Sequence, residues 1–445
     1  MRFASFVRVF TTGLLFVSNA AAQDAMDRGA HMDHSSESAT DMAMSSKAGP
    51  LGIPMSRHAS GTAWQPDSTP MAAIHGEWLG WQLMLHENVF IGYDAQSSRR
   101  GDSQFFSTNW VMGMAQHELG PGELTARVML SLEPWTVGGA GYPLLLQTGE
   151  TWHGEPLHDH QHPHDLFMET ALEYSSALTD DVGVQVYVAP VGEPALGPVA
   201  FPHRASARSD PLGTIGHHWQ DSTHISFGVL TAGIFTRAFK LEGSWFNGRE
   251  PNERRYDFDL RTPDSFAARI SYNPIADLSA QVSWGYLKSP EAAQPEESLQ
   301  RLTASLAWNT AVFTNGNWAS AAIGGVNLQK SEHTTQSSLF ETDLAFDRHH
   351  TIFGRAELAT KTGHDLVLTE EQVDRVFAVG AVSAGYVFSF PAVAKMVPAL
   401  GARGGLNFVG EELGAVYGSR TPVGGALFVR LSPESMPMNG GGHAH

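Results

Sequence analysis

Apolar and polar residues alternate with a period of two along most of this 445-residue chain, from Trp78 to near its end. The clearest stretch, 123–133, reads ELTARVMLSLE. In an extended backbone successive side chains point to opposite faces, so each such stretch predicts a strand with one apolar and one polar face. Counting the stretches gives roughly sixteen strands, within a range of about 12–18.

The connections between these stretches alternate in length. Short turns rich in Gly, Pro, Asn and Asp, such as 120–122 and 273–277, are followed by long loops such as 135–164 and 190–220. A soluble sandwich or propeller would also show alternating strands, but it does not require this rhythm. Transmembrane β-barrels have short periplasmic turns and long outer loops. The sequence therefore predicts an all-β, antiparallel outer-membrane barrel over residues 75–432.

The segments outside the predicted barrel suggest export. Residues 1–22 combine Arg2 and Arg8, an apolar run and Ala20-Ala21-Ala22, which is typical of a signal peptide. Residues 23–74 are low in complexity, and we expect them to be a disordered periplasmic segment. Residues 433–445 form a second tail with Met and His. Both termini are then periplasmic, and the expected partners are membrane lipid, lipopolysaccharide and the barrel-assembly machinery.

Composition narrows the possible ligands. The chain has no cysteine, which excludes disulfides and thiolate metal sites. Its formal net charge of −18 argues against nucleic acid as a partner and favours cations. Thioether and imidazole groups favour copper, and the N-terminal segment carries several of both: His31, Met32, His34, Met42 and Met44. The alternative is a neutral tail whose Met and His are incidental.

Histidines are concentrated in the second long loop. His158, His160, His162 and His164 are spaced by two, so in an extended strand all four project to the same side. Imidazoles placed side by side suit zinc or copper, with carboxylates as further ligands or supporting partners. We therefore predict metal ligands in this loop: His153, His158, Asp159, His160, His162, His164 and Asp165.

The third long loop carries a related group, His217, His218, Asp221 and His224. Because the two loops flank adjacent hairpins, their histidines could meet at the barrel mouth and bind Cu or Zn ions. The alternative is that these histidines are solvated or hydrogen-bonded loop residues. The sequence does not decide whether the loops stand outside the barrel or fold into its lumen.

Carboxylates on the polar faces would line the lumen. Glu133, Glu169, Glu173 and Glu242 predict a cation-preferring interior. The other interpretation is that they pair with nearby basic residues and brace the wall. No nucleophile motif such as G-x-S-x-G occurs, and Ser222, His224 and Asp221 lie too close in sequence to suggest a hydrolytic relay. A lipid hydrolase is therefore a third alternative, and we do not expect an enzyme.

Short motifs resemble two known groups. The runs MDRGAHMDH (26–34) and DMAM (41–44), followed by a barrel, resemble the copper resistance protein B family, which implies copper handling in metal tolerance. The runs STNWVM (107–112), QHPHDLFME (161–169) and GHHWQDSTHISFG (216–228) resemble a poorly characterised group of Gram-negative outer-membrane barrels. The leading hypothesis is a barrel that binds or transports transition-metal cations. The alternative is a general porin-like or structural barrel with incidental histidines.

Overall fold

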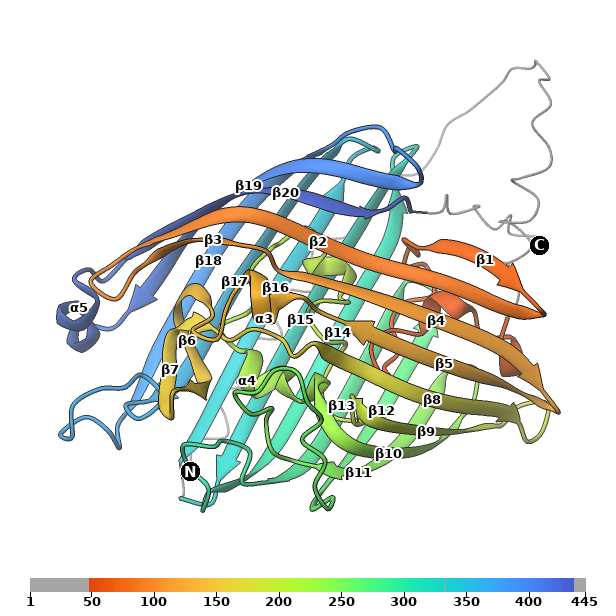
Figure 1. The fold of residues 1–445 in the computed structure, drawn as a ribbon, viewed down its shortest axis with the longest axis horizontal. Coiled ribbons are helices and arrows are strands. Elements are labelled where there is room, and N and C mark those ends of the chain that lie inside the picture. Colours follow the sequence, from red (N-terminus) through yellow and green to blue (C-terminus); the bar gives the residue numbers. More distant parts are fainter. Residues whose placement is uncertain (1–47, 332, 436–445) are drawn as a thin grey trace. The chain divides into compact units, whose positions relative to one another are not determined.

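A computed structural model describes residues 48–331 and 333–435 of the chain, and its main feature is one antiparallel sheet of 18 strands (Figure 1). β1 and β3 pair only with β2, while the other sixteen strands form a closed barrel in which β20 pairs back onto β2. The predicted fold class and strand number are therefore confirmed. The barrel strands are β2 (Trp81–Ser97), β4 (Asn109–Leu119), β5 (Gly122–Leu130), β8 (Phe167–Ala177), β9 (Gly183–Gly192), β10 (Ser226–Phe235), β11 (Phe239–Asn247), β12 (Ser265–Ile275), β13 (Leu278–Lys288), β14 (Ser298–Val312), β15 (Gly316–Gln329), β16 (Thr334–Ala345), β17 (His350–Thr362), β18 (Val376–Ser389), β19 (Met396–Val409) and β20 (Val423–Pro433).

The remaining elements are short. β1 (Ile74–Trp78) and β3 (Ser103–Phe106) extend the two edges of β2, and β6 (Tyr142–Trp152) pairs with β7 (Glu155–Gln161) in a separate hairpin. Among the described residues no helix has the length and apolar character needed to cross a membrane. The helices are η1 (Pro50–Gly52), η2 (Met55–Arg57), α3 (Glu133–Thr136), η3 (Ala205–Ala207), α4 (His217–Gln220), η4 (Ser222–His224) and α5 (Glu411–Tyr417).

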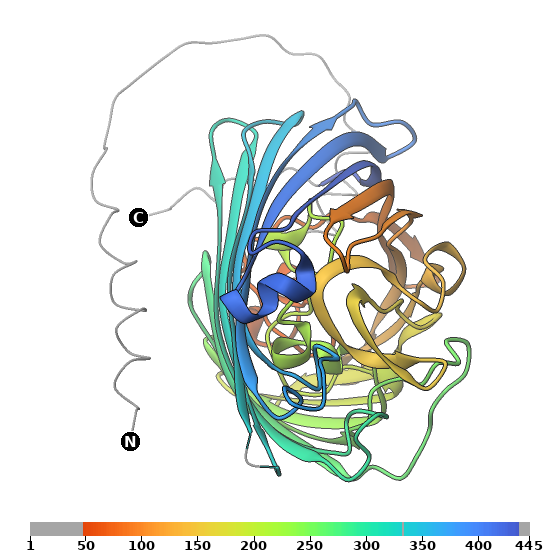
Figure 2. The same ribbon diagram turned by 90° about the vertical axis from the view of Figure 1, so that its left-hand side faces the viewer.

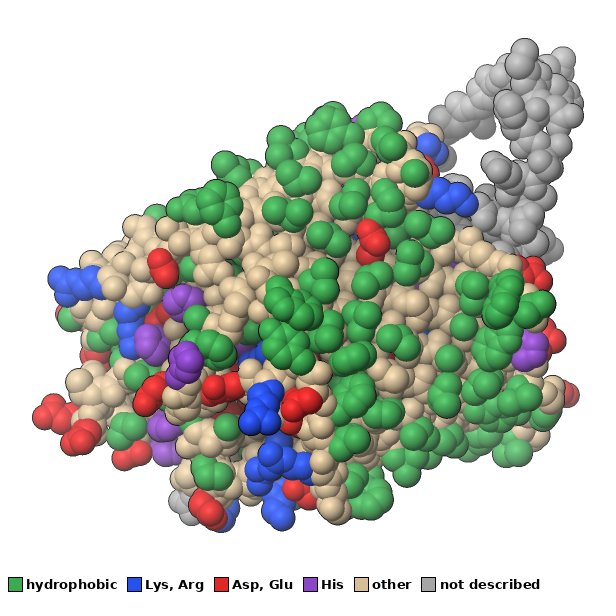
Figure 3. Space-filling model, in the orientation of Figure 1, with side chains coloured by type: hydrophobic (Ala, Val, Ile, Leu, Met, Phe, Trp, Pro, Cys, Tyr) green, Lys and Arg blue, Asp and Glu red, His purple; other side chains and the backbone are tan. Residues whose placement is uncertain are grey.

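The outer surface of the barrel is apolar. On β9, Val186 and Val188 are exposed while Tyr187 between them is completely buried, as the two-residue period requires. Figure 3 shows the same pattern across one face, with hydrophobic side chains over the strands and charged and His side chains mostly at the two ends, more of them at the left. An exposed apolar belt on a closed sheet, which leaves no unpaired strand edge, is the surface of a barrel that spans a lipid bilayer. The protein is an outer-membrane barrel.

Turn lengths divide the barrel into two ends. The tight connections after β4, β8, β10 and β12 lie at one end, and the long connections after β5, β9 and β11 lie at the other. Ala72 bridges to Ser435, so the described chain enters and leaves the barrel at the short-turn end. The predicted rhythm of short and long connections is confirmed.

Three segments fill the lumen, and together we call them the plug: residues 48–73, 131–166 and 193–225. In an end-on view the β6–β7 hairpin and α4 lie inside the ring of strands (Figure 2). Segment 193–225 is fastened to the wall at two strands, since Arg355 on β17 donates to the Leu212 carbonyl and Arg430 on β20 donates to Ser209. The long loops therefore fold inward, a question that the sequence left open.

The first plug segment corrects one prediction. Residues 48–73 were expected to be disordered, but Arg57, Ala63 and Trp64 are buried. Backbone carbonyls of this segment accept hydrogen bonds from side chains on the lumen face of the wall. The Gly61 carbonyl accepts from Arg127 (2.7 Å), and the Trp64 carbonyl accepts from Ser279 (3.2 Å). The composition of this segment predicted disorder because it is polar. Composition alone does not reveal that the lumen of the barrel offers side chains that hydrogen-bond to the segment. The rest of the predicted segment, 23–47, lies outside the described residues.

Candidate metal centre

Two plug segments bring five histidines together in the lumen. His162 and His164 follow β7, while His217, His218 and His224 belong to α4 and η4. All five side chains are buried. The ring centroids of His162 lie 5.6 Å from His217 and 5.5 Å from His218, and those of His164 and His224 are 5.2 Å apart. His217 lies between the groups, 5.1 Å from His218 and 5.3 Å from His224. We call these five residues the histidine cluster.

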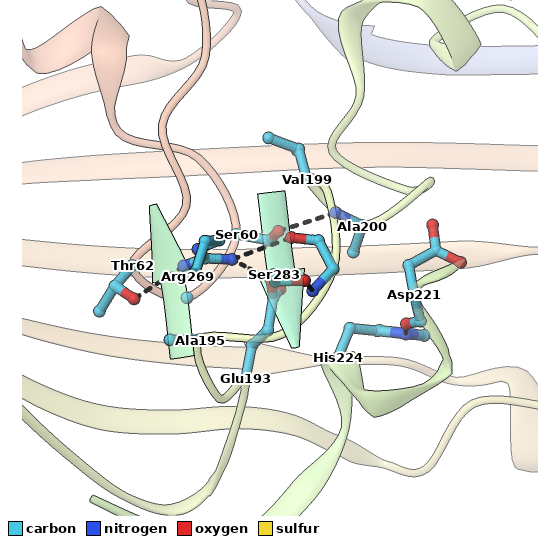
Figure 4. Close-up of polar contacts among 12 residues, drawn as sticks. Ser60, Thr62, Glu193, Ala195, Val199, Ala200, Asp221, His224, Arg269 and Ser283 are labelled. Carbon is cyan, nitrogen blue, oxygen red and sulfur yellow. Dashed lines mark hydrogen bonds and ion pairs between the residues drawn. The ribbon is translucent and has the colours of Figure 1, made fainter. Parts of the chain in front are cut away.

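Contacts with the wall fix α4 in place. The indole nitrogen of Trp219 donates to Thr335 Oγ1 (2.7 Å) and the Gln220 amide donates to Ser337 Oγ (3.0 Å), both on β16. The start of the same segment is also held by hydrogen bonds. The Gly197 amide donates to Ser283 on β13, and the Ala200 amide donates to Ser60 of the first plug segment (Figure 4). Short helices with little intrinsic stability thus acquire defined positions through tertiary hydrogen bonds.

Each Nδ1 atom of the cluster has an oxygen partner. The carboxylate of Glu133 lies 2.9 Å from His164, Asp221 lies 2.8 Å from His217 and Glu250 lies 2.7 Å from His218. Glu150 lies 3.2 Å from His162 Nδ1, and the Asp221 carbonyl lies 2.8 Å from His224 Nδ1. Carboxylate and carbonyl oxygens accept hydrogen bonds, so each Nδ1 carries the proton. In the neutral ring Nε2 then has a free lone pair.

The five Nε2 atoms are all buried and have no hydrogen-bond partner among the described residues. Leaving one such buried polar atom unsatisfied costs about 1–3 kcal/mol. Imidazole rings oriented by a carboxylate on one nitrogen and unbonded on the other are the usual arrangement of metal-ligating histidines. The cluster therefore fits a bound transition-metal ion better than it fits a network of structural hydrogen bonds.

Three members of the cluster are close enough to share one ion. One ring nitrogen from each of His162, His217 and His218 lies within 4.8 Å of the others. Metal–nitrogen bonds of about 2.0–2.1 Å would draw these atoms slightly closer, which small rotations of the side chains can provide. His164 and His224 form an adjacent pair that contacts the three through His217.

The protonation preferences of the cluster differ between neighbours. Burial lowers the pKa of His162 and His224 well below the usual value and lowers that of His217 to about 4, so these rings are neutral and can act as ligands. Burial acts on His164 and His218 in the same direction. The adjacent carboxylates Glu133 and Glu250 outweigh it and raise the pKa of each ring.

The supporting carboxylates give a direct test. Glu250→Gln keeps the size of the side chain but removes the charge that orients His218, and we expect it to weaken metal binding about 10–100-fold. Isothermal titration of the purified full chain with Zn(II) would measure this change. Glu253→Gln is the matched control, because Glu253 lies in the same loop and bonds Thr151 and the His153 amide instead. Equal affinities for Glu250→Gln and the unsubstituted chain would exclude the supporting role.

The four histidines that are spaced by two, at positions 158, 160, 162 and 164, do not project to the same side in the structure. The backbone of Asp159 is left-handed (φ 57°) and β7 ends at Gln161, so the strict alternation assumed for this stretch is wrong. His158 bonds Asp159 (2.9 Å), and His160 is 3.9 Å from Asp102. His153 is exposed beside Trp152. These three histidines do not join the cluster.

The two aspartates predicted as metal ligands in the second long loop instead pair with other residues of the protein. Asp159 accepts the Leu146 amide (2.8 Å) and lies 3.3 Å from Arg100. Asp165 lies 3.2 Å from Arg255, which also bonds Glu150. Arg255 therefore positions the Glu150 carboxylate that faces His162. The predicted ligands His31, Met32, His34, Met42 and Met44 lie outside the described residues.

The lumen carboxylates favour the bracing interpretation. Arg127 contacts Glu169 (3.5 Å) and Glu173 (2.7 Å), and Glu242 contacts Lys240 (3.3 Å) and Arg269 (3.2 Å). Glu133 differs, because it binds His164 through both the backbone amide and the ring. Three of the four acids are thus neutralised by wall cations, and the fourth supports the histidine cluster.

The residue types considered for hydrolysis do not form a relay. Ser222 Oγ accepts a hydrogen bond from Arg301 (2.9 Å), and His224 bonds the backbone carbonyl of Asp221. The carboxylate of Asp221 is directed to His217 and to Arg204 (2.8 Å).

Sequence reasoning missed two of the supporting carboxylates, Glu150 on β6 and Glu250 in the loop after β11. Neither has a fixed spacing to the histidines that it supports, so no local signal identified them. The Asp221 partner was detectable, since residues 217 and 221 are four apart and lie on one side of a helical turn.

Comparisons with known proteins find similar barrels among solved structures and no family for this chain. No family model and no curated protein matches the sequence. Similar solved structures include the anion-selective porin from Comamonas acidovorans (11% identity, TM-score 0.48, 79% of this chain and 99% of that one) and Salmonella typhi OmpF in complex with daunomycin (10%, 0.49, 81% and 100%). The outer-membrane channel DcaP of Acinetobacter baumannii is also similar (8%, 0.43, 81% and 100%). Identities this low say nothing about what the barrel binds, and the fold stands on its own strand pairing.

Proposed function

We propose that this outer-membrane barrel binds transition-metal cations, with copper or zinc at the histidine cluster, as part of metal transport or tolerance. The observation that carries the proposal is the set of five buried Nε2 atoms without partners, on rings whose Nδ1 atoms are all bonded to oxygen. A structural role would need partners for both nitrogens. Copper is favoured over zinc by the Met and His residues of the N-terminal segment.

The charges around the cluster support a cation as its ligand. Four carboxylates, Glu133, Glu150, Asp221 and Glu250, directly contact its rings. Arg255 pairs with Glu150 and Arg204 pairs with Asp221, so these two cations reduce the negative charge around the cluster without cancelling it. Carboxylates held against imidazole rings stabilise a divalent ion and disfavour anions.

A general porin-like channel is the second candidate function. The observation in its favour is a cavity of about 650 Å³ at the short-turn end of the barrel, lined by turn, strand and plug residues. The plug fills the lumen beyond this cavity, so a general channel requires that the plug move.

Metal binding by the purified full chain tests the proposal. After treatment with a chelator, the chain in detergent is titrated with Co(II), whose visible spectrum reports nitrogen ligation, and then with Zn(II) in competition. We expect saturable binding at micromolar or lower concentration and displacement of Co(II) by Zn(II). A chain that stays free of both metals at about 100 μM, well above the affinity expected of built imidazole sites, would contradict the proposal.

A further inference from the structure

A second group of soft ligands lies on the wall, away from the carboxylates of the histidine cluster. In the register of β2, β4 and β5, His86 is directly opposite Met112, and Met112 is directly opposite Met129. Directly opposed residues point to the same face, about 4.5–5.5 Å apart at Cβ, and this is the lumen face because Met112 and Met129 are buried. One imidazole and two thioethers therefore form a continuous row across three strands.

A second row lies two residues farther along the same strands. Met84 on β2 is opposite Met114 on β4. Met84, His86, Met112 and Met114 all line the cavity of about 650 Å³ at the short-turn end. Met129 lies behind this lining, in a buried cluster with Met112. The row therefore begins at the cavity and runs into the barrel.

A plug residue completes the group. His203 Nε2 lies 3.1 Å from Met129 Sδ, and the His203 ring packs on Trp110 with centroids 4.5 Å apart. Metal bonds of about 2.0 Å to nitrogen and about 2.3 Å to sulfur, at right angles, span about 3.1 Å, so one ion can hold both atoms. Burial lowers the pKa of His203 to about 3, which keeps the ring neutral.

An unpartnered ring nitrogen in this group indicates that it binds a ligand. His86 Nε2 is buried and has no hydrogen-bond partner in the described structure. None of the four ligand groups is acidic. Acids such as Glu123 and Glu173 line the cavity together with Arg127 and Arg208. The arginines are nevertheless the charged groups that act on the two rings, Arg208 on His86 and Arg127 on His203. Cationic neighbours and uncharged soft ligands disfavour a divalent ion and favour a soft monovalent one.

We propose that Met112, Met129, His203 and His86 form a binding site for a soft monovalent cation of the Cu(I) type, reached from the short-turn cavity past Met84 and Met114. The site shares no residue with the histidine cluster, so either can exist without the other. The plug nevertheless joins them: Phe201, two residues before His203, packs against His164, His217 and His224. A soft-ion site near the short turns and a divalent-ion site deeper in the plug would then lie one after the other along the lumen.

Silver provides the test, since Ag(I) is a redox-inert probe for thioether sites. The purified full chain in detergent, freed of metal, is titrated with Ag(I), and the bound ion is examined by X-ray absorption. We expect a tightly bound ion with sulfur neighbours in the unsubstituted chain; because the N-terminal segment also carries methionines, the substitutions below assign the ion to the lumen. Bound silver with only nitrogen or oxygen neighbours would overturn the proposal.

Substitution locates the site. Met112→Leu combined with Met129→Leu keeps the side-chain volume, and we expect Ag(I) affinity to fall by more than about 100-fold, because direct ligands matter more than the outer partners whose loss costs about 10–100-fold. Met396→Leu, at the start of β19, is the matched control and should bind like the unsubstituted chain. A chain lacking His162, His217 and His218 should keep its silver site, which separates this proposal from the proposed function. Undiminished binding by a folded double-Leu variant would refute the site.

Discussion

Replacing His162, His217 and His218 together by Ala is expected to weaken Zn(II) or Cu(II) binding at least about 1000-fold, since each direct ligand should contribute more than the about 10–100-fold typical of its outer partner. One ring nitrogen from each lies within 4.8 Å of the others. His164 and His224 remain in this variant, so weak residual binding is the expected end point. Competition titration of the purified chain against a chromophoric chelator measures the change.

The matched control uses histidines from the same loop. His158 and His160 are only partly buried and contact Asp159 and Asp102. Their double Ala variant should keep nearly full affinity. If this variant and the triple variant lost binding equally, the ions would be held by the loop's general histidine content and the buried cluster would not be the site. If neither lost binding, the site would lie elsewhere in the chain.

Replacing Arg204 by Met is expected to loosen the plug and raise the ion conductance of the barrel. The buried Arg204 guanidinium bonds Asp221 (2.8 Å) within the plug and Glu341 (2.6 Å) on β16, so it joins the plug to the wall. Removing one partner of a buried ion pair costs about 3–5 kcal/mol, because the remaining charges are left without compensation. Single-channel recording in planar bilayers measures conductance, and thermal unfolding measures the loss of stability.

Arg375→Met is the control for this experiment. Arg375 also pairs with a glutamate, Glu412, at 2.5 Å, but both side chains are about half exposed (51% and 54%). Such a surface pair contributes about 0–1 kcal/mol, so stability and conductance should change little. A barrel that conducts equally with Arg204 or Met at this position would show that the plug is not held by this contact. High conductance in the unsubstituted chain would instead favour the general channel.

Arg204→Met also links the plug to the metal centre. Asp221 accepts from Arg204 through Oδ2 and faces His217 Nδ1 through Oδ1. Loss of Arg204 therefore frees the carboxylate that orients a cluster histidine. Metal affinity should fall together with plug stability, whereas in Glu250→Gln affinity should fall while the conductance stays low.

The sequence predicted the wall of the barrel well. Its two-residue period assigns Arg127 and Met129 to one face and Val128 to the other, and the structure buries the first two and exposes the third. This succeeds because in a transmembrane barrel every strand has one face in lipid and one in the lumen, so local polarity and tertiary position carry the same information. The alternation of short and long connections was predictable for the same reason.

The plug and the metal centre were predictable only in part. The sequence identified the two histidine-rich loops and the possibility that they meet, and it included all five residues of the histidine cluster among the candidates. It did not separate His162 and His164 from His158 and His160. That separation depends on the left-handed backbone at Asp159 and on the end of β7, which are set by the hairpin and its contacts.

Alternation along the chain therefore determined the barrel, its membrane-facing surface and the loops rich in metal ligands. Only the tertiary structure decided that the loops turn inward, that Glu150 and Glu250 orient His162 and His218, and that His203 approaches Met129. The physical reason is the range of the interactions. A strand's two faces are fixed by neighbouring residues and by lipid, whereas each plug contact joins residues far apart in sequence, whose proximity depends on the closed barrel around them.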